Sequence, residues 1–375
     1  MDNGKMRYIS EDNFFALLGA LRSDYEVYVP VKKGDKRFYK RFIPPTVQPI
    51  EGKKKDGEVL KPAQTDDIVI GEVRPVEPLK AFFYSAREVV AEGFKDYIPH
   101  STDKPFAIVG VKACDLKGFK VQDYVFSGKG RSDSGEKDGD YRDPLYIKNR
   151  EQNLIIASDC TCAINTCFCL ALGIKPHPQE DFDINLSQIK GGFVVESGSP
   201  KGERLIKKHS SLFEEARQGY IAERERLRTG VIKEVEGNIK ENHVPHQDLY
   251  KGIIAKNIES TIWPDKAKTC VECGACNVIC PTCHCFLLYD QKDEKRMERL
   301  RIWDSCMIKD FARVAGGANP RPKLWMRLRN RFEKKFDFFP KAAGIYACTG
   351  CGRCISACPA KIDIRDVLKE LVGNV

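Results

Sequence analysis

The chain has 375 residues, 42% of them hydrophobic, which is enough for two or three domains with buried cores. Its first ten residues are polar and no apolar stretch is long enough to span a bilayer, so the sequence predicts neither a signal peptide nor a membrane span. The 16 cysteines therefore do not indicate an ordinary disulfide scaffold. In a cytoplasmic protein they favour metal ligands or redox centres, in an anaerobic cell or shielded from oxygen.

The formal net charge of +9 is concentrated in one segment of the sequence. Residues 295–335 contain 13 Lys and Arg against 4 Asp and Glu, which equals the excess of the whole chain. A basic stripe of this kind is most often a solvated helical face, and docking to an acidic protein surface is the next interpretation. Nucleic-acid binding is disfavoured because no recognition motif accompanies the charge.

The first half of the chain alternates between helical and strand patterns. Ser10 is an expected N-cap before apolar residues at helical spacing, and a turn at 33–36 joins two short strands into a hairpin. Segment 86–94 has a helical pattern. Three apolar runs predict buried strands, at 106–111, 154–158 and 193–197. This alternation predicts an α/β or α+β fold.

The charged segment 211–240 is predicted to be helical and to link two domains. We place an α/β domain at 1–255 and a mainly α-helical, ferredoxin-like dicluster domain at 256–375. Two cysteine runs in the second domain are separated by the long segment 281–347, which is predicted to be mostly helical. This separation fits a helical dicluster domain better than a compact ferredoxin that contains β-structure.

The two cysteine runs share the spacing C-x2-C-x2-C-x3-C-P. In two-cluster ferredoxins, three cysteines of such a run bind one cluster and the cysteine before the proline ligates the other. The sequence therefore predicts two [4Fe–4S] clusters with crossed ligands. One is held by Cys270, Cys273, Cys276 and Cys358, and the other by Cys348, Cys351, Cys354 and Cys280. The alternative, a pair of zinc ribbons, favours C-x2-C pairs over runs of four.

Five further cysteines lie upstream of these runs. Cys114 and Cys160 each follow a predicted strand, at the edge where α/β sheets place their ligands. We predict a third [4Fe–4S] cluster here, with Cys162 as the substitute if one ligand is wrong. The four predicted ligands are Cys114, Cys160, Cys167 and Cys169. The alternative is that these cysteines are small buried hydrophobes.

Three cysteines remain, Cys283, Cys285 and Cys306. They either pack around a cluster, which we favour, or form part of a further metal site with another ligand. His284 is a weak indication of a ligand, because a histidine near a cluster can simply hydrogen-bond to sulfur.

Several motifs in and around the runs resemble a known family. The motifs are Cys280-Pro281-Thr282-Cys283-x-Cys285-Phe286, Trp303-Asp304-Ser305-Cys306, Ala315-Gly316-Gly317, Gly350-Cys351-Gly352-Arg353-Cys354, Lys112-Ala113-Cys114-Asp115-Leu116 and Cys167-Phe168-Cys169. They look like the dicluster iron–sulfur subunit of anaerobic sulfite reductase and are equally similar to the beta subunit of cytosolic sulfhydrogenases. The resemblance covers most of the chain. It departs at Ala113, where the family pattern leads us to expect proline.

The resemblance implies a subunit that passes electrons between a flavoprotein subunit that handles NAD(P)H and a catalytic or further iron–sulfur subunit. The residues agree, since the chain has no triad signature, no H-E-x-x-H and no Rossmann fingerprint. We therefore predict an electron-transfer subunit of a multi-subunit cytosolic oxidoreductase, without catalytic residues, that serves a hydrogenase, a sulfite or sulfur reductase or a similar enzyme. The alternative is an N-terminal domain that itself holds a flavin. A DNA-binding regulator is disfavoured because no helix-turn-helix pattern is found.

Overall fold

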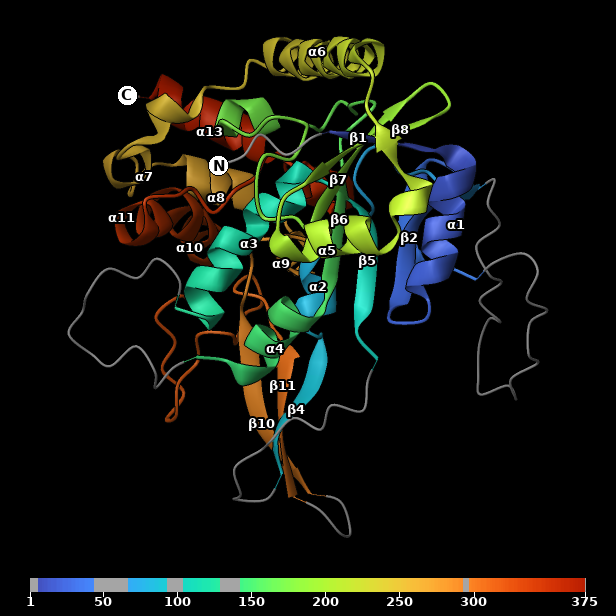
Figure 1. Ribbon diagram of the computed structural model, residues 1–375. Helices are drawn as coiled ribbons and strands as arrows, with labels where there is room; N and C mark the ends of the chain where they lie inside the picture. Colours follow the sequence, from blue (N-terminus) through green and yellow to red (C-terminus); the bar gives the residue numbers. More distant parts are fainter. Residues whose placement is uncertain (1–5, 44–66, 93–103, 129–141, 293–296, 375) are drawn as a thin grey trace.

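The computed structural model describes residues 6–43, 67–92, 104–128, 142–292 and 297–374, and every cysteine lies within these ranges. Figure 1 shows a central sheet flanked by helices, a helical region beside it and a narrow sheet that projects from the body. The predicted fold class is confirmed: an N-terminal α/β part is followed by a largely helical C-terminal region.

The N-terminal part is built on an eight-stranded mixed sheet with the order β3-β2-β5-β6-β7-β8-β1-β9. Its strands are β1 (Arg7–Ser10), β2 (Glu26–Lys33), β3 (Lys36–Arg41), β5 (Phe106–Val111), β6 (Leu154–Ser158), β7 (Ile184–Ile189), β8 (Gly192–Ser197) and β9 (Glu214–Glu215). Strands β2, β5, β6 and β7 are parallel neighbours. The continuous apolar runs of β5 and β6 follow from their central position, where both faces of a parallel sheet are covered. The three predicted strands and the β2–β3 hairpin are confirmed.

Helices cover both faces of this sheet. On one face, α1 (Glu11–Leu21) and α5 (Pro200–Lys208) pack against a core that includes Val27, Val109 and Ile156. On the other face, α2 (Lys80–Phe83), α3 (Ala113–Phe126) and α4 (Pro144–Gln152) pack with Ile108 and Ile155. Ser10 caps α1 as predicted, because its side chain accepts a hydrogen bond from the amide of Asn13.

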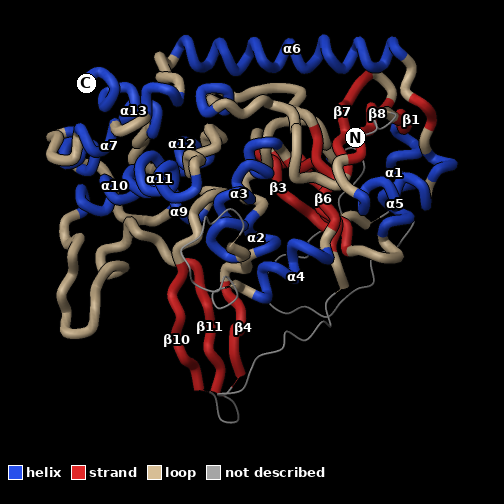
Figure 2. The backbone as a smooth tube through the Cα atoms, turned by 60° about the vertical axis from the view of Figure 1, so that its left-hand side comes forward, coloured by secondary structure: helices blue, strands red, loops and turns tan. Residues whose placement is uncertain are grey.

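The helical region continues from the long helix α6 (Gln218–Glu241), which runs along the top of the molecule in Figures 1 and 2. The helix predicted over 211–240 is thus present, although it begins seven residues later, at Gln218. The remaining helices are α7 (Ile253–Lys256), α8 (Ile262–Ala267), α9 (Ala275–Val278), α10 (Leu324–Glu333), the π-helix η5 (Lys334–Phe338), α11 (Phe339–Ala343), α12 (Arg353–Ala357) and α13 (Ile364–Gly373), with short 3-10 turns at η2 (Cys169–Leu172), η3 (Ser210–Leu212) and η4 (Gln247–Tyr250). No helix of the described ranges combines the length and the apolar character needed to cross a membrane.

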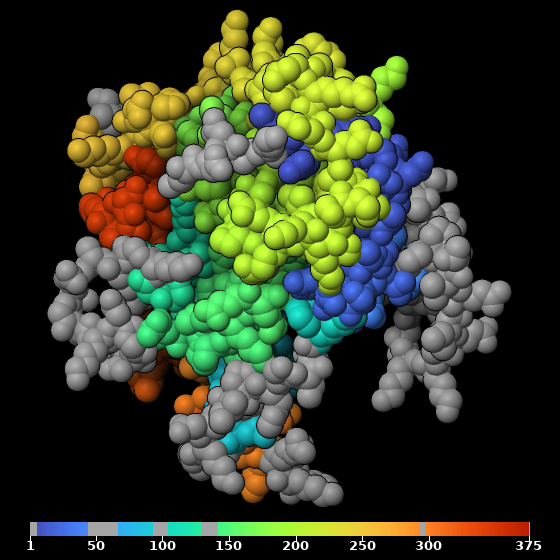
Figure 3. Space-filling model, viewed as in Figure 1, coloured from blue at the N-terminus to red at the C-terminus, as the bar shows by residue number. Residues whose placement is uncertain are grey.

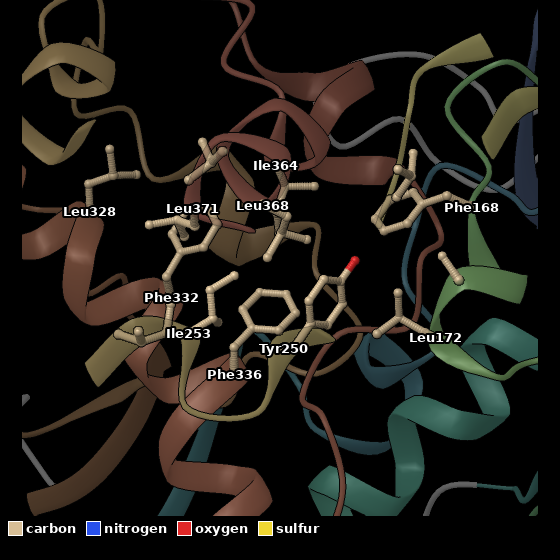
Figure 4. Packing of buried hydrophobic residues seen from close by; sticks show 14 of the residues in the cluster. Phe168, Leu172, Tyr250, Ile253, Leu328, Phe332, Phe336, Ile364, Leu368 and Leu371 are labelled. Atoms are coloured by element: carbon tan, nitrogen blue, oxygen red, sulfur yellow. The ribbon is translucent and has the colours of Figure 1, made fainter. Parts of the chain in front are cut away.

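The largest hydrophobic core joins the two predicted domains. Figure 4 shows Phe168 and Leu172, from the loop after β6, beside Tyr250 and the aromatic rings of α10 and η5. Cysteines of both ferredoxin-type runs pack against the same core: Cys270, Cys276, Cys348 and Cys354. The domain division at residue 255 stays a prediction, and the cysteine runs are supported by side chains from both sides of it.

Two helix predictions are wrong, because both segments contain strands of one small sheet. Segment 86–94 contains β4 (Arg87–Glu92), and segment 281–347 contains β10 (Phe286–Lys292) and β11 (Met297–Trp303), which form a three-stranded antiparallel sheet in the order β10-β11-β4. Residues 93 and 94 lie outside the described ranges. Strand β4 pairs with a strand about two hundred residues later, Val89 opposite Leu300, and such long-range pairing overrides a local helical pattern. This sheet projects from the body in Figure 2 and at the bottom of the space-filling view in Figure 3.

Candidate iron–sulfur sites

All 16 cysteines are free thiols. They gather where the carboxyl ends of β5 and β6 meet the helical region. We name three groups after the sequence predictions. The first ferredoxin-type site is Cys270, Cys273, Cys276 and Cys358; the second ferredoxin-type site is Cys348, Cys351, Cys354 and Cys280; the N-terminal site is Cys114, Cys160, Cys167 and Cys169.

The four cysteines of the first ferredoxin-type site line one cavity. Its other walls are largely apolar and include Met307, Leu328 and Phe332. The run curls around the cavity because Gly274, at φ +70°, begins α9 in the left-handed conformation, and a Cβ there would lie 3.0 Å from Ser305. Cys273 is exposed, so this site reaches the protein surface.

The second ferredoxin-type site is more deeply placed. Helix α9 packs against α12, which lays the two runs side by side. Burial raises the pKa of Cys348 and of Cys354, and neighbouring thiols raise both further: Cys354 and Cys280 act on Cys348, and Cys351 and Cys280 act on Cys354. The four cysteines predicted from crossed ligation are therefore brought together. Cys280 and Cys351 are both buried.

The five upstream cysteines line one further cavity, as their positions after strands predicted. Cys114 lies in the first turn of α3, directly after β5, and Cys160 follows β6. The cavity is lined by Cys114, Cys160, Cys162, Cys167, Cys169 and, from the second run, Cys351. Cys162 thus shares the cavity with the four predicted ligands, and the choice between them stays open.

The second cysteine run approaches the N-terminal site through two glycines. The amide of Phe168 donates to the carbonyl of Gly350 at 2.9 Å. A Cβ on Gly350 would lie 2.6 Å from the Cα of Cys169, and a Cβ on Gly352 would lie 2.1 Å from the carbonyl oxygen of Thr166. Both glycines also have positive φ angles, so only glycine permits this contact without distortion.

The helical end of the basic segment, in α10 and η5, does not turn most of its cations to solvent, although Lys309, Arg313 and Lys323 before it are exposed. Arg327 and Arg331 of α10 and Lys335 of η5 are buried, with exposed fractions of 1%, 5% and 3%. Arg327 pairs with Glu272 at 2.7 Å, and Arg331 donates to the side chain of Asn277 at 3.1 Å. Docking to an acidic protein surface, the second interpretation of the basic segment, is contradicted for Arg327, Arg329 and Arg331, because these arginines turn inward or lie largely covered against the protein. Charge counting alone does not distinguish an outward stripe from an inward one.

Sequence reasoning also missed several buried cations beside the thiols. Lys112 donates to Ser158 at 2.6 Å and to the carbonyls of Ile70 and Asp159 at 2.7 and 3.2 Å. Burial lowers the pKa of Lys112, although the nearby Cys160 opposes this effect. The sequence position of Lys112 could have indicated a cation beside the thiols, because Lys112 lies at a strand end two residues before Cys114.

Another buried pair connects α12 to α3. Arg353 donates to Asp115 at 2.7 Å, and both side chains have an exposed fraction of 0%. Arg353 follows Gly352 in the second run, and Asp115 follows Cys114 of the N-terminal site. The pair therefore locks two cysteine-bearing segments together, while Arg74 donates to the carbonyl of Cys351.

Burial changes the pKa of several of these thiols. It raises the pKa of Cys160 and of Cys348 to about 12 and that of Cys276 to about 11. The pKa of Cys280 is lowered instead, first by a hydrogen bond from Cys283 and further by the positive charge of Lys335. Thiols must lose their protons to bind iron, so assembly of metal at these sites releases protons.

Three thiols lie around Asn277 and at the base of the β10–β11 hairpin. Cys306 accepts a hydrogen bond from the side-chain amide of Asn277 at 3.0 Å. A thiol hydrogen bond also joins Cys306 to Cys285, and another joins Cys283 to Cys280. Within the described ranges, no three His, Cys, Asp or Glu side chains converge as ligands of a single metal ion. In a four-iron cluster, by contrast, each thiolate binds a different iron. Whether these three cysteines bind metal stays a hypothesis.

His284 does not face these sulfur atoms through its Nδ1. That nitrogen lies 3.1 Å from the carbonyl oxygen of Thr282, and the ring meets the edge of Phe339. Burial lowers the pKa of His284 to about 4.

Comparisons with known proteins agree with this arrangement. Residues 269–362 match the family model of the 4Fe-4S dicluster domain. The chain is also 29% identical over 317 residues to sulfhydrogenase 2 subunit beta of Pyrococcus furiosus, a match that covers 82% of this chain and 86% of that protein. The chain is thus similar to this beta subunit over most of its length. The resemblance stated from the motifs is confirmed, as is the iron–sulfur character of the C-terminal region.

Proposed function

We propose that the chain is the iron–sulfur electron-transfer subunit of a hydrogenase-type complex. The two ferredoxin-type sites would each hold a [4Fe–4S] cluster, and the N-terminal site would hold a third. Bound clusters supply reversible one-electron storage. The residues of the chain position them, exclude water and set their charge environment.

One observation carries this proposal: the three sites adjoin one another through a single short segment. Cys354 belongs to the second ferredoxin-type site and also lines the cavity of the first. Cys351 belongs to the second site and also lines the N-terminal cavity. A continuous series of thiol sites therefore runs from the exposed Cys273 to the carboxyl ends of β5 and β6, which is the arrangement a relay requires.

The proposed partners follow from the two ends of this series. The relative is named as the beta subunit of a sulfhydrogenase, so it belongs with other subunits. For the present chain we propose a flavoprotein subunit that handles NAD(P)H at one end and a catalytic or further iron–sulfur subunit at the other. Cys273 offers one contact point, because Val271 beside it is 63% exposed and apolar.

The number of clusters tests the proposal directly. We expect roughly twelve iron atoms and as many acid-labile sulfides per anaerobically purified chain, falling to about eight in Cys114→Ser, since each four-iron cluster takes four cysteines. Cys162→Ser is the matched control from the same cavity and should keep roughly twelve. If iron were lost in Cys162→Ser and retained in Cys114→Ser, Cys162 would replace Cys114 as the proposed ligand. Equal iron near eight in all three proteins would confine the relay to the C-terminal region.

The visible spectrum and the native complex test the remaining parts. A broad iron–sulfur absorption without flavin is expected for the reconstituted chain, whereas a flavin band would support the alternative of a flavin-binding N-terminal domain. Purification of the native complex should recover a flavoprotein and a catalytic subunit with the chain. Recovery of the chain with neither would contradict the proposed role.

A further inference from the structure

One helical segment places a cation beside each ferredoxin-type site. Arg331 of α10 and Lys335 of η5 are four residues apart and lie on the same side of the segment. Arg331 donates to Asn277 Oδ1 at 3.1 Å and to the carbonyl of Cys276 at 3.4 Å, in the first run. Lys335 donates to Cys280 Sγ at 3.3 Å. Of the two cations, only Lys335 contacts the sulfur of a proposed ligand.

Lys335 is held firmly in this position. Its ammonium group also donates to Thr282 Oγ1 and to the carbonyl of Ala347, both at 2.9 Å. All three acceptors are close, and the described residues provide no carboxylate that pairs with Lys335. The ammonium group is thus held between two oxygens and the sulfur of Cys280.

Lys335 lies in an uncommon type of helix. Residues Lys334–Phe338 form a π-helix between α10 and α11, and π-helical turns are rare and frequent at functional sites. The amide of Ala347, next to Cys348, donates to the carbonyl of Lys335 at 3.0 Å. The neighbouring Lys334 instead lies partly exposed near the ring of Phe311.

We infer that Lys335 raises the reduction potential of the second ferredoxin-type site. This inference rests on the proposed function, because it takes Cys280 as a ligand. Reduction adds negative charge to a cluster, and a buried cation that donates to a ligand sulfur stabilises that added charge. Arg331, which lines the cavity of the first site, is the corresponding cation there.

The competing interpretation is purely structural: Lys335 would only join Thr282 to Ala347. A potential distinguishes the two, because a structural link has no preference between oxidised and reduced states. Lys335→Met removes the charge and the donor, Lys335→Gln keeps a donor without the charge, and Lys335→Arg keeps both. Lys334→Met is the matched control, since it removes the adjacent lysine that does not touch a ligand.

The experiment is a redox titration of the anaerobic holoprotein followed by electron paramagnetic resonance. The signal that changes in Cys280→Ser identifies the second site. Lys335→Met and Lys335→Gln should lower the midpoint of this signal by at least ~59 mV, a tenfold change in a one-electron equilibrium. Lys335→Arg should largely restore it, and Lys334→Met should leave it unchanged.

Iron content separates the possible failures. If the unmodified chain lacks two ferredoxin-type signals, the proposed function itself fails. If both signals are present and the charge-free variants with full iron content show no shift, or shift both sites equally, the role of Lys335 is overturned. If Lys335→Met loses the second cluster, the midpoints of Lys335→Gln and Lys335→Arg are compared instead. Both variants keep a donor at the sulfur and differ in charge, so a lower midpoint in Lys335→Gln supports the role of the charge. Loss of that cluster in both charge-free variants but not in Lys335→Arg would overturn a tuning role in favour of assembly.

Discussion

The ion pair between Arg353 and Asp115 shows how single residues hold the sites in place. Both side chains are fully buried and 2.7 Å apart, and they join α12 to the first turn of α3. Arg353→Met leaves the Asp115 carboxylate buried without a counter-charge among the described residues, with only the amide of Leu79 donating to it. We expect the free energy of unfolding to fall by about 3–5 kcal/mol, the usual cost of breaking a buried pair from one side.

Denaturant unfolding of the holoprotein measures this effect. The double variant Arg353→Met with Asp115→Asn should recover part of the loss, because no uncompensated charge remains. Arg299→Met is a suitable comparison, since Arg299 pairs with Asp290 where both side chains are 52% exposed. Such a surface pair contributes little. If Arg299→Met and Arg353→Met lowered the free energy of unfolding equally, the burial of the Arg353–Asp115 pair would be unimportant.

At the scale of elements, the decisive contact is between the second cysteine run and the loop after β6. Gly350→Ala places a Cβ 2.6 Å from the backbone of Cys169 and should push the two segments apart. We expect iron to be lost from the second ferredoxin-type site and from the N-terminal site together. Iron and sulfide analysis, with the thermal midpoint, checks this.

Gly344→Ala provides the control for Gly350→Ala. Gly344 has a similar positive φ, +67° against +61°, but an added Cβ there meets nothing within 4 Å. Both variants share the backbone strain, about 1–3 kcal/mol, and only Gly350→Ala adds the collision. Full iron content in Gly350→Ala would mean that the two segments do not need their close approach.

Local signals predicted those elements that local interactions decide. Ser10 predicted the start of α1, and the apolar runs predicted β5 and β6, because capping and burial on both faces act over a few residues. Strand β4 was missed because its partner β11 is remote in sequence. Cysteine spacing predicted two crossed groups of thiols, which as cluster ligands stay a prediction. The buried direction of Lys335 depends on packing of η5 that no local pattern reveals.

At the scale of the molecule, cluster loss should affect the two predicted domains unequally. Residues 256–375 contain the ferredoxin-type runs in short helices and turns, so binding energy at the sites acts there as folding energy. Hydrogen exchange of the apo and holo chains should show the larger loss of protection in this region. Amides of β5 and β6, in the middle of the eight-stranded sheet, serve as the internal control and should stay protected. Equal loss in both domains would contradict the division at residue 255.

The position of the second run also determines when the protein can mature during synthesis. Every cavity described above is closed by residues 348–358: Cys354 and Cys358 for the first site, and Cys351 for the N-terminal cavity. These residues leave the ribosome after all the other cysteines, so neither ferredoxin-type site is complete until the second run has emerged. The N-terminal site has its four proposed ligands earlier, but its cavity still lacks the wall that Cys351 provides. Iron delivery to the ferredoxin-type sites must therefore follow synthesis of the second run, and until then the upstream cysteines are open to oxidation. A chain arrested before residue 348 would contain every strand described above and neither ferredoxin-type site complete.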